Sequence, residues 1–522
     1  MEIGKLSKDI RTQMKKDRKS YRLKIFEKHI VKTGGIKKAV KFMTDKTNWI
    51  PKMKDRTDTT KTKRYDILNI ATKFYEDLYS KKIKTDETDL QSNETVPPIL
   101  KGEIIKAIET QKIDTAPGPD SISNALLMEC KSVLAPILQY IFNDILDTET
   151  IPTQWANSSI TLLHKKGDKN EINNYRPISL MSNIYKVFAK IILRRITRNL
   201  DENQPREQAG FRAGYSTLDH IHAGDPISPK LFTAVLEEIF RKLDWDQYGL
   251  NIHGQHLNNL RFADDIVIFA ESSTHLRSML EDLERESRKV GLTMNITKTK
   301  IMTNATESPI ILNSKPIEYV KEYTYLGQQI SINNVMSKEI DTRIGLAWKS
   351  HWRLKEIMKN EETNVYIKKK LFNTCVLPVL TYGCQTWSLT KAQTSKIRTC
   401  QTSMERSMLN IRKKDRVRNK TIRKRTKVED VICKTRKLKW EWTGHILRGC
   451  EKWNRTLIFW YPKNGKRKRG RQIRRWEDEI VATAGKTWTR TALNRKEWKG
   501  MEEAFAKLGQ TDQSADVDSS ES

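Results

Sequence analysis

The stretch LRFADDIVIFAE, at residues 260–271, constrains the fold of this chain more than any other. One apolar run ends at Asp264 and Asp265, and a second begins directly after them. Both runs are rich in β-branched and aromatic residues, and Asp favours turns because its side chain can hydrogen-bond its own backbone. The pattern predicts two short strands that meet at a tight turn carrying two adjacent carboxylates.

Two interpretations of this turn remain open from the stretch alone. Most Asp-Asp pairs between strands are solvated turns without a chemical role. The alternative is a Mg²⁺ site, because Mg²⁺ takes oxygen ligands and is commonly bound by one or two carboxylates plus substrate phosphates. Two such ions about 3.5–4 Å apart can hold the attacking and leaving oxygens of a phosphoryl transfer.

The charge of the chain points to a polyanionic partner. Its 522 residues carry a formal net charge of +32, and 37% of them are hydrophobic. We find no basic amphipathic helix with a broad apolar face, so nucleic acid is favoured over a membrane surface. We expect no membrane span and no signal peptide, hence a location in the nucleus or cytoplasm. The six cysteines lie far apart in the sequence without a paired pattern, which suggests that they are reduced thiols.

Apolar periodicity predicts helices and strands in a mixed order, which is typical of an α+β fold. Turn residues precede the second helix, where Ser121 or Ser123 is a candidate N-cap. Residues 1–95 are expected to be Lys-rich and mostly helical, with a linker at residues 84–95. We predict helices at residues 65–80, 124–146, 184–200, 230–243, 276–290 and in 335–410, and strands at 155–163, 292–302 and around 323–327.

Cationic residues occur where a phosphate-binding surface is possible. Lys165, Lys166 and Arg176 flank the strand at 155–163, and Arg offers a bidentate fork to phosphate oxygens. A solvated face of a core element explains such charges equally well.

The segment at residues 412–475 is the most basic part of the chain, with 25 Lys and Arg against 5 Asp and Glu. Seven of the thirteen tryptophans lie at or after Trp440, so the region suits phosphate neutralisation combined with base stacking. Residues 463–471, KNGKRKRGR, also fit a nuclear localisation signal. Cys433, His445 and Cys450 lack a fourth ligand and a CxxC spacing, which argues against zinc.

Seven short blocks together resemble the reverse transcriptase of non-LTR (LINE-type) retrotransposons, in the order that this family has. They are PGPDSI at 117–122, NNYRPISLMSNIYKVFAKII at 173–192, QAGFRAGYST at 208–217, GDPISPKLF at 224–232, FADD at 262–265, GLTMNITKTK at 291–300 and YTYLG at 323–327. GHILR at 444–448 and KRKRGRQIRRWEDEI at 466–480 resemble the downstream region of such elements.

The resemblance implies a right-hand polymerase with fingers, palm and thumb that uses Mg²⁺ and deoxynucleoside triphosphates to copy an RNA template from a DNA primer. Asp264 would be the principal metal ligand, with Asp265 beside it. Contacts to nucleotide or primer are implied for Lys165, Arg176, Gly224, Lys298, Tyr325 and Gly327. Basic residues expected to bind nucleic acid are Arg467, Lys468, Arg469, Arg471, Arg474 and Arg475.

The chain departs from the family in one block. Members place a strand with another metal-binding aspartate, then a helix, between AGFRAGYST and GDPISP, whereas only six residues separate Thr217 from Gly224 here. Asp219 lies in that interval without a strand run to hold it. We therefore expect an incomplete palm sheet, an incomplete two-ion site and impaired catalysis. Nothing in the chain resembles the N-terminal endonuclease domain of many such elements, so we do not expect self-sufficient retrotransposition.

These features predict an α+β right-hand polymerase with a basic helical C-terminal region. The expected parts are a basic helical N-terminal region (1–95), fingers (96–223), palm (224–334), thumb-like helices (335–411), a basic Trp-rich region (412–509) and an acidic tail (510–522). The leading hypothesis is a retroelement-derived RNA-directed DNA polymerase of impaired activity. The alternative is a non-catalytic nucleic-acid-binding relic, and a nuclease ranks last because it needs a second carboxylate cluster.

Overall fold

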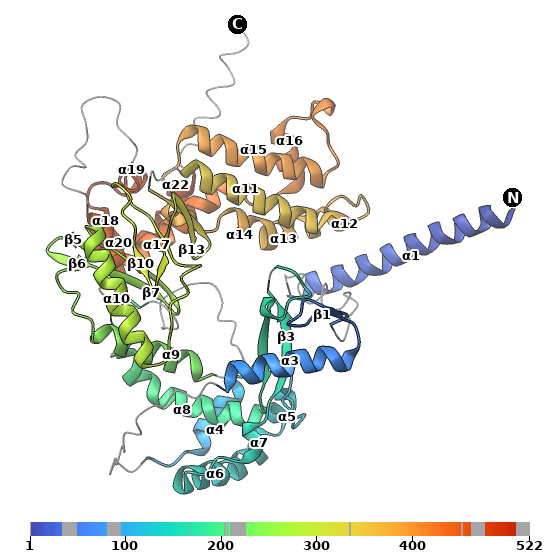
Figure 1. Ribbon diagram of the computed structural model, residues 1–522. Helices are drawn as coiled ribbons and strands as arrows, with labels where there is room; N and C mark the ends of the chain where they lie inside the picture. Colours follow the sequence, from blue (N-terminus) through green and yellow to red (C-terminus); the bar gives the residue numbers. More distant parts are fainter. Residues whose placement is uncertain are drawn as a thin grey trace. The chain divides into compact units, whose positions relative to one another are not determined.

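The computed structural model describes residues 2–33, 50–80, 96–165, 167–202, 205, 207–208, 226–332, 336–449, 453–460 and 475–507. The chain divides into two compact units (Figure 1). The first unit comprises residues 1–46, 300–307 and 318–522, and the second comprises 47–299 and 308–317. Both units contain helices and short strands, so the predicted α+β class is confirmed at that level.

One core of the second unit is helical. Buried Phe142 and Trp155 lie in it together with Val187 and Ile191, which come from the predicted amphipathic helix at 184–200. The Ser123 side chain accepts a hydrogen bond from the Leu126 N–H, which confirms one of the two candidate caps. The helices are α4 (Lys101–Glu109), α5 (Asn124–Glu129), α6 (Lys131–Thr148), α7 (Thr153–Ala156) and α8 (Asn183–Glu202).

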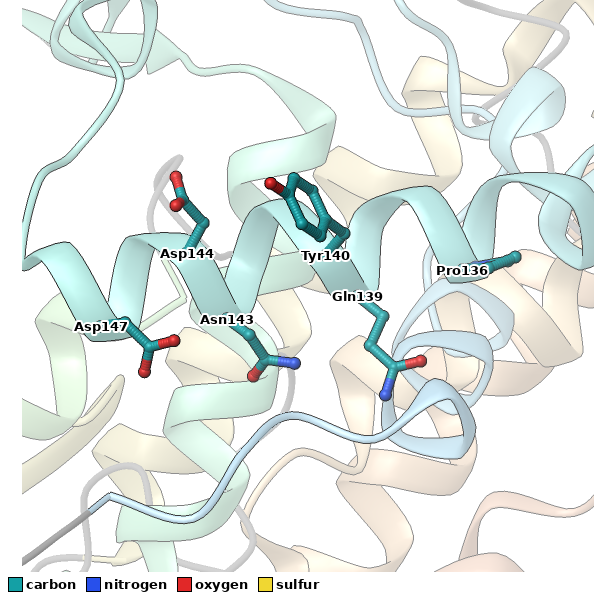
Figure 2. A pocket seen from close by; sticks show the side chains of 6 residues that line it. All are labelled: Pro136, Gln139, Tyr140, Asn143, Asp144 and Asp147. Carbon is teal, nitrogen blue, oxygen red and sulfur yellow. The ribbon is translucent and has the colours of Figure 1, made fainter.

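The predicted single helix at 124–146 is wrong in one respect, because it breaks at Cys130 into α5 and α6. A shallow hollow lies along α6, where Gln139 and Asn143 point toward the segment that precedes α4 (Figure 2). Both of these side chains donate hydrogen bonds to the Ile99 carbonyl, each 3.1 Å long. The hollow is therefore lined by side chains that fasten the fold.

A second part of this unit is built on two antiparallel pairs. Trp155 was predicted to begin a strand but lies in α7, so the strand starts at Ser159. Strand β3 (Ser159–His164) pairs with β4 (Tyr175–Leu180), which follows the short helix η1 (Ile172–Asn174). The remaining elements are β1 (Met53–Lys54), β2 (Thr60–Lys61) and α3 (Arg64–Tyr79), the last of which confirms the helix predicted at 65–80.

The third part of this unit carries the Asp-Asp stretch. Helices α9 (Ser228–Arg241) and α10 (Ser273–Lys289) pack beside a two-stranded sheet of β7 (Asn259–Phe262) and β8 (Asp265–Ile268) (Figure 1). Their positions confirm the helices predicted at 230–243 and 276–290. Two further hairpins are β5 (Leu250–Ile252) with β6 (Gln255–Leu257), and β10 (Ile311–Leu312) with β11 (Lys315–Pro316).

The strand predicted at 292–302 is mostly wrong. Only β9 (Lys300–Ile301) forms, in parallel pairing with β12 (Glu318–Tyr319). Upstream, the Asn295 side chain accepts hydrogen bonds from the Lys298 N–H (3.2 Å) and the Thr297 hydroxyl (2.7 Å). This Asn-initiated turn competes with an extended chain, and the β-branched residues around it gave a misleading signal.

The first unit is mainly helical. A core containing Phe26, Trp387 and Met404 joins its N-terminal helix to the helices after residue 336. Hairpin β13 (Glu322–Tyr325) with β14 (Gln328–Ser331) confirms the predicted strand pair. The other elements are α1 (Glu2–Thr33), α11 (Met336–Arg353), α12 (Lys355–Met358), α13 (Val365–Leu371), η2 (Phe372–Val376), α14 (Leu377–Leu380), η3 (Cys384–Thr386), α15 (Lys391–Met408), η4 (Lys413–Asp415) and α16 (Asn419–Thr426).

The C-terminal helices of this unit have a tryptophan core of their own. Trp440 and Trp498 stack with ring centroids 3.7 Å apart, and each indole N–H donates to the carbonyl of the other residue. Trp453 and Trp488 are also buried. The helices are α17 (Val431–Arg448), α18 (Trp453–Phe459), α19 (Asp478–Ala484), α20 (Trp488–Leu493), α21 (Arg495–Gly500) and α22 (Glu502–Lys507).

This burial corrects the prediction of base stacking in the region. Four of the seven C-terminal tryptophans are inside the core, and Trp442, Trp460 and Trp476 are only partly accessible. The tryptophans therefore hold the helices together, because an indole enclosed by protein has no free face for a base. Across the described ranges, no helix is long and apolar enough to cross a membrane.

Candidate active site

The two aspartates lie at the tip of the β7–β8 hairpin, as the sequence predicts. Phe262 pairs with Asp265, so Ala263 and Asp264 form a two-residue loop. Ala263 adopts a φ of 54°, in the left-handed region that short hairpin loops often require. The turn therefore presents two carboxylates on adjacent residues at the end of a paired ribbon.

Both aspartates are exposed, but their surroundings differ from bulk water. Protein atoms desolvate the Asp265 carboxylate and raise its pKa, and the negative charge of Asp264 raises it further. The positive charge of Lys165 lowers the pKa of Asp265 and so opposes both effects. Two other residues that the sequence nominated, Asp264 and Lys165, thus both influence the Asp265 carboxylate.

The hairpin rests on a buried ion pair. Arg261 Nη1 in β7 lies 3.0 Å from Glu237 Oε2 in α9, and the Arg261 side chain is 3% exposed. The same guanidinium lies over the Phe240 ring, 4.0 Å from its centroid. Burial lowers the pKa of Arg261, and the Glu237 carboxylate counteracts this shift. Both charges are largely withdrawn from water, so each needs the other as its partner. The pair therefore connects β7 to α9, and loss of either side chain would leave the remaining charge buried and uncompensated.

A second contact supports the other side of β7. The Arg261 N–H donates to the Glu207 carbonyl (2.9 Å), and Gln208 forms a parallel bridge to Arg261. Gln208 is fully buried, and its Oε1 accepts a hydrogen bond from the Ala263 N–H at 3.3 Å. Residues that precede the family's GDPISP block in sequence therefore brace the loop of the carboxylate hairpin.

The cations predicted to meet phosphate lie on the β3–β4 hairpin. Arg176 is opposite Leu163, and the Lys165 N–H donates to the Asn174 carbonyl at 2.8 Å. Alternation along the strand places Lys165 on the same face as Leu163, so Lys165 and Arg176 are diagonal neighbours on one face. Both side chains are exposed and suit an anionic ligand.

Lys298 belongs to this unit too, but in a turn rather than a strand. Its N–H donates to the Asn295 carbonyl at 3.0 Å, and its side chain is exposed. Gly224 and Lys166 lie outside the described residues, as do Arg467, Lys468, Arg469, Arg471 and Arg474. Arg475 is described and partly buried, and its N–H donates to Asp478 Oδ2 at 2.7 Å.

Tyr325 and Gly327 belong to the first unit, in the β13–β14 hairpin. Leu326 and Gly327 form its two-residue loop with φ values of 47° and 80°, and two consecutive positive φ angles are characteristic of a type I′ turn. The Tyr382 hydroxyl donates to the Leu326 carbonyl at 2.7 Å, and Arg343 donates to the Gly327 carbonyl. The loop is thus held by one side chain from α11 and one from the turn that follows α14.

The donor set of the carboxylate hairpin fits one hard cation. Asp264 and Asp265 offer carboxylate oxygens, which are the ligands that Mg²⁺ prefers. Among the described residues, no group of three or more His, Cys, Asp or Glu side chains is placed to hold a metal ion. Lys165 would compete with a metal cation for the negative charge of Asp265. The same lysine would attract a phosphate that binds together with the metal.

Comparison with known proteins identifies the family. Residues 220–330 match the reverse transcriptase (RNA-dependent DNA polymerase) family. An uncharacterised transposon-derived protein of Caenorhabditis elegans is 33% identical over 270 residues, which cover 48% of this chain and 96% of that protein. The chain therefore belongs to the reverse transcriptase family of non-LTR retrotransposons, as its seven blocks predict. This family generally depends on divalent metal ions.

Named polymerases match shorter stretches. The protein named probable RNA-directed DNA polymerase from transposon BS of Drosophila melanogaster is 34% identical over 147 residues, which are 28% of this chain and 16% of that protein. The RNA-directed DNA polymerase of the mobile element jockey, also from Drosophila melanogaster, is 28% identical over 139 residues, or 26% and 15%. The chain thus matches about a sixth of the length of these polymerases.

Sequence reasoning missed the residues that support the hairpin. Glu237, Arg261 and Gln208 were assigned no part in the site, although all three contact or pair with its strands. One signal was available, because alternation in a strand puts Arg261 on the face opposite Leu260 and Phe262. A charged residue so close to the Asp-Asp turn needs a partner, but its partner is 24 positions away, in helix α9.

Proposed function

We propose that this chain is a retrotransposon-derived RNA-directed DNA polymerase domain protein whose nucleotidyl transfer is impaired. The observation that carries the proposal is the carboxylate pair at the tip of β7–β8, inside the segment that matches the reverse transcriptase family and within the field of Lys165. The partners in this proposal are an RNA template, a DNA primer and deoxynucleoside triphosphates.

The site residues have distinct roles in the proposal. Asp264 and Asp265 hold Mg²⁺, which when bound would offset the negative charge of the reacting phosphates. Lys165 and Arg176 present two cations on one face of a rigid hairpin and contact the triphosphate, where an Arg fork matches phosphate oxygens. Lys298 contacts the triphosphate from its turn. The block that begins at Gly224 borders the nascent base pair, and Tyr325 and Gly327 contact the primer.

The parts of a right-hand polymerase follow the same order along the chain. We assign fingers to residues 96–223, palm to 224–334 and thumb to 335–411, with a basic N-terminal region before them. The basic region at 412–509 binds nucleic acid and includes Arg467, Lys468, Arg469, Arg471, Arg474 and Arg475, and an acidic tail occupies 510–522. A nuclear or cytoplasmic location fits these partners.

Impairment follows from the spacing of the blocks. Only six residues separate Thr217 from Gly224, which leaves no room for a strand that carries another metal-binding aspartate and a helix. Two carboxylates bind one cation. A two-ion site needs further ligands, because the two cations repel each other. The Mg²⁺ centre of this chain is therefore incomplete.

Primer extension tests the proposal. Purified full-length protein is incubated with a primed RNA template, Mg²⁺ and all four deoxynucleotides, beside an Asp264→Ala variant and a matched Asp246→Ala variant. Asp246 is an exposed aspartate of the same unit outside the proposed site. We expect RNA binding by all three proteins, without extension.

The outcomes separate the parts of the proposal. Extension that Asp264→Ala abolishes and Asp246→Ala preserves would refute the impairment while supporting a polymerase site at the hairpin. Extension that survives Asp264→Ala would refute the assignment of the site. Loss of RNA binding by the unmodified chain would refute both the polymerase and its alternative, a non-catalytic nucleic-acid-binding relic, which the basic composition of residues 412–475 favours as second candidate.

A further inference from the structure

A run of exposed cations surrounds α16 in the first unit. Residues 412–427, here called the basic arm, contain ten Lys and Arg against one Asp. All ten except Arg423 are exposed at the surface. The exposed cations are Arg412, Lys413, Lys414, Arg416, Arg418, Lys420, Lys424, Arg425 and Lys427.

These cations differ from some exposed lysines of the same unit, which have acidic partners. Lys338 pairs with Glu322, and Lys396 pairs with Asp341. In the ranges that the structure describes, none of the nine exposed cations of the arm forms an ion pair with a carboxylate. The arm therefore carries a concentrated positive field that the protein itself does not neutralise.

The backbone of the arm is fixed in place although its surface is so highly charged. Arg406 of α15 donates to the Val417 carbonyl (2.7 Å) and to Asn419 Oδ1 (2.9 Å). At the other end, the Thr426 hydroxyl donates to the buried Glu405 carboxylate at 2.8 Å. Ile422, fully buried, anchors the middle of α16. The backbone that carries the charges is preformed, so binding an anion orders side chains but requires little ordering of the backbone.

Two of the cations occupy backbone positions that suit glycine better. Arg416 and Lys427 both have a φ of 49°, in the left-handed region. A side chain there costs roughly 1 kcal/mol or more relative to glycine. These two residues place positive charges shortly before α16 and at its C-cap.

We propose that the basic arm is a nucleic-acid-binding surface that contacts phosphates without reading bases. This proposal rests on the proposed function, which supplies a nucleic acid as the polyanion, and it locates a contact outside the segment that matches the polymerase family. The arm contains no aromatic residue on which a base could stack. Helix α16 is about 12 Å long, roughly the axial length of three to four base pairs, so about four phosphates lie within its reach.

Salt dependence of binding tests the proposal. The full chain carrying Lys413→Gln, Lys414→Gln, Lys420→Gln and Lys424→Gln is compared with a matched control in which four exposed lysines of α1, Lys5, Lys8, Lys16 and Lys24, are changed to Gln. Affinity for a fluorescent single-stranded RNA and for DNA of the same sequence is measured by anisotropy from 50 to 300 mM KCl.

We expect the slope of log affinity against log salt to fall in magnitude by about three in the arm variant, since each lost phosphate contact contributes about 0.7. Affinity at 100 mM salt should fall at least roughly tenfold, equally for RNA and DNA, and Lys→Arg at the same four positions should retain the unmodified slope. An unchanged slope, or an equal change in the α1 control, would overturn the proposal. The proposal would also be overturned if the arm variant lost binding to anionic vesicles while it bound both oligonucleotides as tightly as the unmodified chain.

This test does not depend on catalysis. A lowered slope together with absent primer extension would support the arm whatever the polymerase site does. Primer extension reports on the polymerase assignment and the salt slope reports on the arm, so failure of the arm and failure of the polymerase assignment give different results. Thermal unfolding of the arm variant verifies that its fold is retained, as expected for four exposed side chains.

Discussion

Replacing Arg261 by Met should loosen the carboxylate hairpin. The substitution leaves Glu237, which is about 10% exposed, without its nearest buried cation. Removing one partner of a buried ion pair typically costs about 3–5 kcal/mol. Because the half-exposed Arg241 lies 3.1 Å from the other oxygen of Glu237, the lower limit of about 3 kcal/mol applies.

The double variant Arg261→Met with Glu237→Leu separates pairing from packing. It removes both charges while keeping apolar contact with Phe240, so its cost should be below about 1 kcal/mol. Arg285→Met serves as control, because this exposed arginine pairs with Asp282 at the surface, where such pairs contribute little.

Hydrogen exchange with mass spectrometry over residues 259–268 measures the effect locally. About 3 kcal/mol corresponds to roughly 150-fold faster exchange in the single variant, if opening is local. The double variant should restore most of the protection from exchange that the single variant loses in this segment. A single variant that exchanges no faster than the control would refute the reasoning, as would a double variant as fast as the single one.

Three further predictions concern stability in the first unit. Trp498→Ala should lower the free energy of unfolding by about 3–5 kcal/mol in urea titrations, because it removes the 3.7 Å stack on Trp440 and the buried hydrogen bond from the Trp498 indole N–H to the Trp440 carbonyl; a loss under 1 kcal/mol would contradict this. Tyr382→Phe should cost about 1 kcal/mol by deleting the hydrogen bond to Leu326, and an unchanged unfolding midpoint would show that this bond does not stabilise the β13–β14 loop. Burial lowers the pKa of His351 from 6.5 to about 4, so the unfolded chain binds more protons than the folded chain between these pH values. The free energy of unfolding should therefore fall by about 2 kcal/mol from pH 7 to pH 5. The His351→Gln variant should not show this fall.

The hairpins of both units were accessible from sequence because their signals are local. β-Branched strands flank a two-residue loop in the Asp-Asp stretch, and the Tyr-Leu-Gly stretch ends with a glycine that tolerates a positive φ. Ser123 was identifiable as a cap because its hydroxyl bonds the backbone only three residues later. Local hydrogen bonds of this kind depend little on the rest of the fold.

The errors share a different cause. The stretch around Asn295 is rich in β-branched residues but forms a turn instead of a strand. The Asn295 side chain bonds the Lys298 N–H, and this bond competes with the backbone hydrogen bonds that a neighbouring strand would supply. The tryptophans near the C-terminus look like a stacking surface by composition, but burial of Trp440 and Trp498 is decided by packing between helices 58 positions apart. The Arg261–Glu237 pair likewise exists only once α9 meets β7.

Counting bound manganese ions tests the central claim of an incomplete two-ion centre most directly. Mn²⁺, a magnetic stand-in for Mg²⁺, is titrated into the full chain and into Asp264→Asn while electron paramagnetic resonance follows the free ion. We expect a difference of at most one weakly bound ion per chain between the two proteins. A difference of two tightly bound ions would contradict it, because a complete two-ion site would then exist at the hairpin.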